Sequence, residues 1–266
     1  MNRLETLTQQ LRSKNQRGLA PYLTAGDGGL ENTLRELQAI EQAGAACVEL
    51  GVPFSDPIAD GPHLQAAAQR SLDAGTSLSG VIDMIQDFRD AGGNMPIALM
   101  SYANPLVRHG LSETAVRIAK AGADALIIPD LPLEEGAPLE AACEATNLCP
   151  IFFAAPTSSE ARIEEAGRRS RGFLYVVGRI GVTGASTSFD EETQAFLQRT
   201  RAISKAPIAV GFGIGNADHV RGAVRHADLA IVGTALVRHL HEVEQERADR
   251  AIAAANMVHA LTQGLK

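Results

Sequence analysis

The chain has 266 residues, of which 45% are hydrophobic and 21% are charged, and its formal net charge is −7. This ordinary globular composition excludes a largely disordered chain, and the lack of a basic block gives no support to binding of nucleic acid or an anionic membrane. No apolar run reaches the roughly 20 residues of a membrane span, and the polar start of the chain does not indicate a signal peptide.

Three cysteines occur, at positions 47, 143 and 149, and they form no CxxC pair. Three cysteines cannot all pair within one chain, so a reduced, cytoplasmic setting is expected.

Short apolar runs alternate with segments of helical period along the whole chain. A short helix is expected up to residue 14, with Leu4, Leu7 and Leu11 on one face. Eight strands are then predicted, with helices between them, at residues 19–24, 46–51, 97–102, 125–130, 151–155, 173–177, 208–212 and 229–232. From Ala235 onward the chain is predicted to be mostly helical.

Eight strand–helix units in a chain of this length predict an α/β fold, a single (β/α)8 TIM barrel with an extra N-terminal helix that spans residues 1–266. The competing fold is a doubly wound open sheet. A dinucleotide-binding sheet of that kind would show G-x-G-x-x-G after its first strand, and residues 24–29 do not complete that pattern.

Functional residues of such a barrel gather where the strands end. Glu49 lies in the second apolar strand and shares a face with Cys47, whereas Val48 and Leu50 face the helices. A carboxylate is costly to bury as an anion, so Glu49 is a candidate acid or base at the barrel mouth. The alternative is a structural acid paired with an arginine or lysine.

The loop that follows, residues 52–62, contains three prolines and carries Asp56 and Asp60. It is either a rigid arm that holds an acid over the barrel mouth or a solvated surface loop. Both readings are open from the residues alone.

Glycine-rich turns after the seventh and eighth strands predict a phosphate site. They contain Gly213 and Gly233, and the second turn continues into Thr234. Glycines let backbone N–H groups approach an anion, and these two loops are the recurrent phosphate site of the fold. The alternative is that these glycines only permit tight turns between a strand and the following helix.

The loop after the sixth strand, residues 178–189, is small, polar and glycine-rich, as is typical of a loop that closes over a substrate. A plain connector is the alternative. None of the four lysines is placed at a strand's carboxyl end, and only His63 and His109 fall in loops after strands. A Schiff-base aldolase and a metal-dependent aldolase are therefore not expected, and no metal is predicted.

Residues 48–62 read VELGVPFSDPIADGP, and this stretch resembles the signature of the tryptophan synthase alpha chain family. Further matches are LTAGD at 23–27, YANP at 102–105, PDLP at 129–132, GVTG at 181–184 and GFGI at 211–214. Departures from the family pattern include Gly28 in place of proline, Thr234 in place of serine, and Gly178 and Ile180 in the loop after the sixth strand.

The resemblance implies a barrel that cleaves indole-3-glycerol phosphate to indole and glyceraldehyde 3-phosphate. It implies no cofactor in this chain, and a partner β chain, in an α2β2 heterotetramer, that uses pyridoxal phosphate to join indole to serine. Glu49 would be the general acid/base, Asp60 would hold the indole N–H, and Tyr175 would lie beside the reacting centre. The implied substrate- and phosphate-binding residues are Tyr22, Thr183, Gly184, Phe212, Gly213, Gly233 and Thr234.

Two carboxyl groups in different environments can divide acid–base roles between them. We expect a raised pKa for Glu49 and a normal or lowered pKa for Asp60. The alternatives are a free-standing indole-3-glycerol-phosphate lyase, a non-catalytic sugar-phosphate-binding barrel, and another phosphate-binding barrel such as an isomerase.

Overall fold

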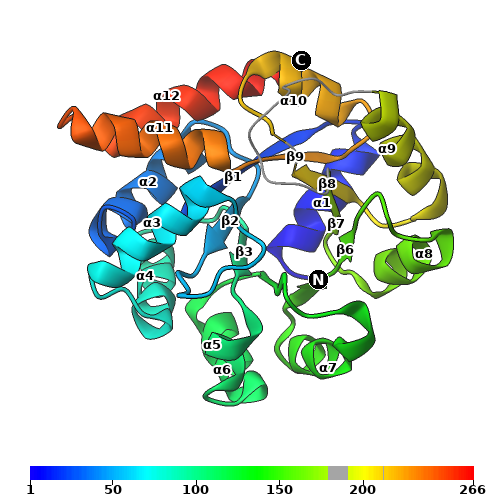
Figure 1. Cartoon of the computed structure of the whole chain (residues 1–266), viewed down its shortest axis with the longest axis horizontal. Helices are drawn as coiled ribbons and strands as arrows, with labels where there is room; N and C mark the ends of the chain where they lie inside the picture. Colours follow the sequence, from blue (N-terminus) through cyan, green and yellow to red (C-terminus); the bar gives the residue numbers. More distant parts are fainter. Residues whose placement is uncertain (179–190, 212) are drawn as a thin grey trace.

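A computed structural model describes residues 1–178, 191–211 and 213–266, and in these residues nine parallel strands form one sheet with helices around it (Figure 1). The strands are β1 (Gly18–Thr24), β2 (Val48–Gly51), β3 (Ile97–Met100), β4 (Ala125–Ile127), β5 (Cys149–Ile151), β6 (Phe153–Ala154), β7 (Leu174–Val177), β8 (Ile208–Gly211) and β9 (Leu229–Val232). The spatial order β5-β4-β3-β2-β1-β9-β8-β7-β6 is that of the predicted barrel.

The fifth barrel strand is divided in two, which differs from the single strand predicted at residues 151–155. β5 pairs with β4, β6 pairs with β7, and only Phe152 separates them. Pro150 lies within β5. The change of partner between β5 and β6 brings the two ends of the sheet together and closes the barrel.

The helices are α1 (Arg3–Ser13), α2 (Leu30–Gln42), α3 (Pro62–Asp73), α4 (Leu78–Asp90), α5 (Ala103–Val107), α6 (Leu111–Ala121), α7 (Ala137–Thr146), α8 (Glu160–Arg169), α9 (Glu191–Ile203), α10 (Ala217–Val224), α11 (Thr234–Gln245) and α12 (Arg250–Thr262). None of those described is long and apolar enough to cross a membrane.

The strands bury both faces, as strands of a parallel barrel must. Val48 and Leu50 belong to the core between strands and helices, whereas Cys47 belongs to the core inside the barrel. This division confirms the predicted facing of the second strand. Leu4 and Leu11 of α1 join the interior cluster, so α1 plugs the end of the barrel where the strands begin.

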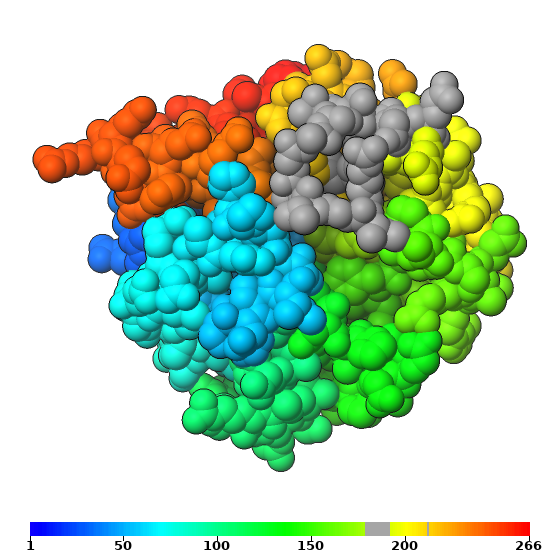
Figure 2. All heavy atoms as spheres, viewed as in Figure 1, coloured from blue at the N-terminus to red at the C-terminus, as the bar shows by residue number. Residues whose placement is uncertain are grey.

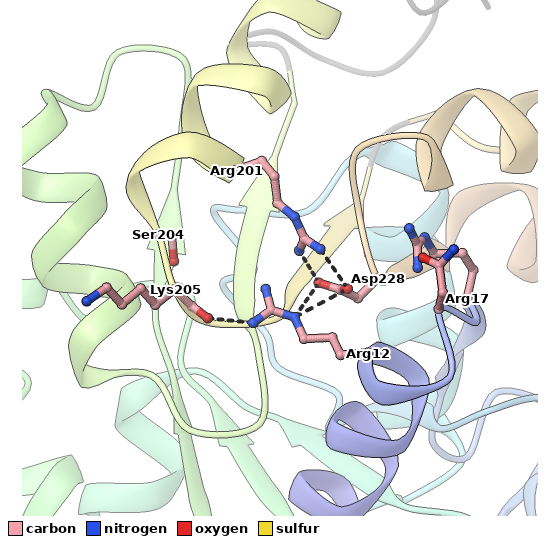
Figure 3. Close-up of a pocket in the computed structure, with 7 residues that line it drawn as sticks. Arg12, Arg17, Arg201, Ser204, Lys205 and Asp228 are labelled. Atoms are coloured by element: carbon pink, nitrogen blue, oxygen red, sulfur yellow. Dashed lines mark hydrogen bonds and ion pairs between the residues drawn. The ribbon is translucent and has the colours of Figure 1, made fainter.

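Two buried aspartates fasten this closed end. Asp228 precedes β9, accepts the Ile208 N–H at 2.8 Å, and pairs with Arg12 of α1 and Arg201 of α9 (Figure 3). Asp124 precedes β4, accepts the Ile97 N–H at 2.9 Å, and pairs with Arg3 and Arg89. The two ends of α1 are thus pinned by ion pairs to the starts of strands.

Candidate active site

Glu49 projects from β2 into the barrel, and its side chain is 3% exposed. It lies opposite Tyr22 in the β1–β2 register, and the Tyr175 hydroxyl donates to its Oε2 atom at 3.1 Å. Burial raises the pKa of Glu49 to about 8, the hydrogen bond from Tyr175 opposes that rise, and the nearby Asp60 adds to it. Glu49 can therefore carry a proton near neutral pH and also release it, as predicted.

Asp60 lies in the loop between β2 and α3. It is close enough to Glu49 that both carboxylates raise the pKa of Tyr22 and of Tyr175. Tyr102, at the start of α5, holds this loop. Its ring stacks on Phe54 with centroids 5.2 Å apart, and its hydroxyl accepts the Ala59 N–H at 3.0 Å. The same hydroxyl hydrogen-bonds to the Asp60 carboxylate, so Tyr102 positions the second acid.

The expected normal or lowered pKa of Asp60 is wrong. Burial raises its pKa to about 6, and the hydrogen bond from Tyr102 opposes that rise only in part. The expectation failed because no arginine or lysine within the described ranges pairs with this carboxylate. Asp60 is nevertheless mostly ionised at neutral pH, since its pKa remains below 7.

Tyr22 and Tyr175 form two walls of the barrel interior, and each lies over a glycine. A Cβ built at Gly51 would lie 2.1 Å from the Tyr22 hydroxyl, and one built at Gly211 would lie 2.7 Å from the Tyr175 hydroxyl. Both glycines therefore provide the space that the phenol rings occupy. The Tyr175 ring also lies 4.9 Å from the ring of Phe153, centroid to centroid.

Two predicted phosphate residues, Gly233 and Thr234, form the start of α11. The first N–H groups of a helix have no partner within it and favour an anion. The loop after β8 lies beside this helix start, because a Cβ built at Gly215 would be 3.6 Å from that of Ala235. Gly213 has φ of +48° and open space where a side chain would be. The structure thus brings both predicted glycine turns together.

Thr183, Gly184 and Phe212 lie outside the described residues, as does the predicted closing loop beyond Gly178. The loop between β2 and α3 lies on the face of the molecule turned to the viewer in Figure 2, where it is blue to cyan. The described part of the site consists of two acids, Glu49 and Asp60, three tyrosines, Tyr22, Tyr102 and Tyr175, and the two glycine turns, all at one end of the barrel.

A model of the tryptophan synthase alpha chain family matches residues 8–266. The chain belongs to the tryptophan synthase alpha chain family. The alpha chain of Alkalilimnicola ehrlichii is 42% identical over 257 residues, which are 96% of this chain and 94% of that one. That of Roseiflexus castenholzii is 42% identical over 264 residues and covers 99% and 100% of the two chains.

Solved structures of the family share the fold. The crystal structure of tryptophan synthase subunit alpha from Legionella pneumophila has a TM-score of 0.92 and 32% identity, and the match covers 100% of this chain and 98% of that one. A structure of Mycobacterium tuberculosis tryptophan synthase has a TM-score of 0.88 and 31% identity, with 99% and 98% covered. Alpha chains of this family cleave indole-3-glycerol phosphate.

Sequence reasoning missed one residue of this alpha-chain site. The sequence assigns Tyr102 no role beyond its place in the YANP match, although its side chain contacts the loop that carries Asp60. Its position directly after β3, next to β2 in the sheet, is the signal that could have identified it. Over the ranges described, no group of His, Cys, Asp or Glu residues could hold a metal ion.

Proposed function

We propose that Glu49 is the general acid/base that cleaves indole-3-glycerol phosphate in this chain, and that Asp60 holds the indole N–H. As a member of its family, the chain is a carbon–carbon lyase of tryptophan biosynthesis. The observation that carries the residue roles is a buried carboxyl group that pairs with no cation among the described residues and lies beside a second acid.

The reaction needs a proton at indole C3 and the removal of a proton from the hydroxyl on the adjacent side-chain carbon. Neutral Glu49 gives its proton to C3, and the positive charge then rests on the indole ring, where the ionised Asp60 accepts the N–H. The Glu49 carboxylate next takes the hydroxyl proton. The carbon–carbon bond breaks, its electron pair returns to the ring, and indole and glyceraldehyde 3-phosphate separate. Such acid–base catalysis contributes roughly 10²- to 10⁴-fold.

Phosphate binding belongs to the same proposal. Gly213, Gly233 and Thr234 would hold the phosphoryl group through backbone N–H groups and the threonine hydroxyl. Tyr22 would form a wall of the indole pocket, and Tyr175 would lie beside the reacting atoms. Thr183, Gly184 and Phe212 are assigned to substrate binding on the family resemblance alone.

The partner proposed is a β chain in an α2β2 heterotetramer, which brings pyridoxal phosphate and joins indole to serine. Ile58, in the loop that carries Asp60, is 80% exposed, and Val107 of α5 is 53% exposed. Exposed aliphatic side chains at the site end of the barrel suit a partner that covers it. The three buried free thiols support a cytoplasmic location.

The test is indole release by purified chain, alone and with a β chain, for wild type and Glu49→Gln. Glu49→Gln should abolish cleavage and retain ligand binding. Glu36→Gln is a matched control, because Glu36 is also a buried glutamate with a raised pKa but pairs with Arg250 away from the barrel interior. Activity that survives Glu49→Gln would refute the mechanism, and release that ignores the β chain would favour a free-standing lyase.

A further inference from the structure

His219 lies in the first turn of α10, directly after the glycine turn assigned to phosphate. Asn216 caps this helix, and its Oδ1 atom accepts the His219 backbone N–H at 2.9 Å. The imidazole folds back over the turn. Its Nδ1 atom is 3.3 Å from the Gly215 backbone nitrogen, which donates to it, and its Nε2 atom is 3.3 Å from the Asn216 amide nitrogen.

These contacts place the imidazole between two donors. The amide of Asn216 cannot be turned over, because its oxygen accepts the helix N–H and its nitrogen must therefore face Nε2. A neutral imidazole has one acceptor nitrogen and one N–H. The imidazole can consequently accept from only one of the two donors, whichever ring nitrogen carries the proton.

The Gly215 N–H is the donor that can find another partner. Gly215 lies beside Ala235 in the first turn of α11, whose own N–H groups face the predicted phosphate position. A phosphoryl group there would accept the Gly215 N–H. Nδ1 would then be free to carry the ring proton and donate it to a phosphate oxygen, while Nε2 accepts from Asn216.

We propose that His219 is a further phosphate-binding residue of this chain, which exchanges the Gly215 N–H for a phosphate oxygen when the ligand binds. The step moves one proton from Nε2 to Nδ1 through solvent, and the ring gains no net charge. The inference rests on the proposed function only for the identity of the phosphate ester, since the geometry concerns the phosphoryl group itself.

The direct test is the tautomer of His219 in ¹⁵N-labelled chain, measured by two-bond ¹H–¹⁵N correlation with and without inorganic phosphate or glyceraldehyde 3-phosphate. The proton should reside on Nδ1 in the presence of either ligand and should shift toward Nε2 in its absence. A tautomer that saturating ligand leaves unchanged would overturn the proposal. This readout stands even if the chain does not cleave indole-3-glycerol phosphate.

The kinetic test compares His219→Ala with His226→Ala, a histidine just beyond the other end of α10. His219→Ala should raise KM for indole-3-glycerol phosphate about 3- to 10-fold with kcat within about 2-fold, because a typical hydrogen bond contributes a net of about 0.5–1.5 kcal/mol. His219→Gln, which keeps a donor and an acceptor, should recover part of that loss. If the wild type is active and His219→Ala has the same KM, the inference is refuted and the proposed function stands.

Discussion

Replacing Tyr175 with phenylalanine tests how the environment of Glu49 sets its acidity. The change removes only the hydroxyl that donates to Glu49 Oε2 at 3.1 Å and leaves the ring in place. In the proposed mechanism the free enzyme needs Asp60 ionised and Glu49 protonated. Their pKa values of about 6 and about 8 predict a bell-shaped pH dependence of kcat/KM, with an acidic limb near 6 and an alkaline limb near 8.

The size of the effect follows from the hydrogen bond. A hydrogen bond to a charged group contributes about 1.5–3 kcal/mol, and 1.36 kcal/mol corresponds to one pKa unit, so its loss raises the pKa by about 1–2. The neutral carboxyl group can also accept from Tyr175, which cancels part of the difference. We therefore expect Tyr175→Phe to move the alkaline limb upward by about 1 and to leave the acidic limb in place.

The assay is initial-rate indole release across pH, at substrate concentrations well below KM. Tyr102→Phe is the matched control, because its hydroxyl bonds to Asp60 and its loss should move only the acidic limb upward. An alkaline limb that stays in place or moves downward in Tyr175→Phe would show that this hydroxyl does not stabilise the Glu49 carboxylate. A shift of both limbs in either variant would show that the two acids titrate as one coupled pair.

Three further predictions concern stability and fit. Folding raises the pKa of Glu49 from 4.5 to about 8, so between these values the folded state binds more protons than the unfolded state. The stability of the wild type therefore falls as pH rises from about 5 to 8. In urea titrations over this range, Glu49→Gln should gain stability relative to wild type by up to about 1.4 kcal/mol per pH unit. Gly211→Ala should lower kcat/KM at least about 10-fold, because its Cβ meets the Tyr175 hydroxyl at 2.7 Å, and Tyr175→Phe in that background should restore part of the loss rather than add to it. Asp228→Asn should lower the free energy of unfolding by about 2–4 kcal/mol in urea, because it leaves two arginines without their shared buried anion, and unchanged stability would show that the pairing contributes nothing.

The barrel could be predicted from sequence because its strands and helices have different apolar periods, and because eight such units fit the length. The division of the fifth strand could not. Residues 149–154 are all buried or half-buried, and nothing in their apolar pattern marks Phe152 as the point where the pairing partner changes. That change depends on closure of the whole sheet, which is a tertiary property.

The candidate site, like the fold, was predictable only in part. Alternation along β2 correctly placed Glu49 inside the barrel, and burial alone gave the correct direction for its pKa. The pKa of Asp60 depends instead on how deeply the fold buries a loop carboxylate and on which groups lie beside it, and among the described residues the neighbour is the Tyr102 hydroxyl rather than a cation. The contact between Tyr102 and the loop joins residues 43 apart, so no local pattern could reveal it.

The pairing of buried acids separates structural from catalytic carboxylates in this barrel. At the closed end, Asp124 and Asp228 each accept a backbone N–H and pair with two arginines, which compensates the cost of burying an anion. At the open end, the described residues offer Glu49 and Asp60 only tyrosine hydroxyls, which stabilise an anion less than a guanidinium does. An arginine beside Glu49 would lower its pKa and remove the neutral form that must protonate the indole ring. The absence of such a cation in the described barrel interior is therefore a requirement of the proposed chemistry. Glu49 can exchange a proton near neutrality because, among the described residues, only the Tyr175 hydroxyl compensates its burial, and only in part.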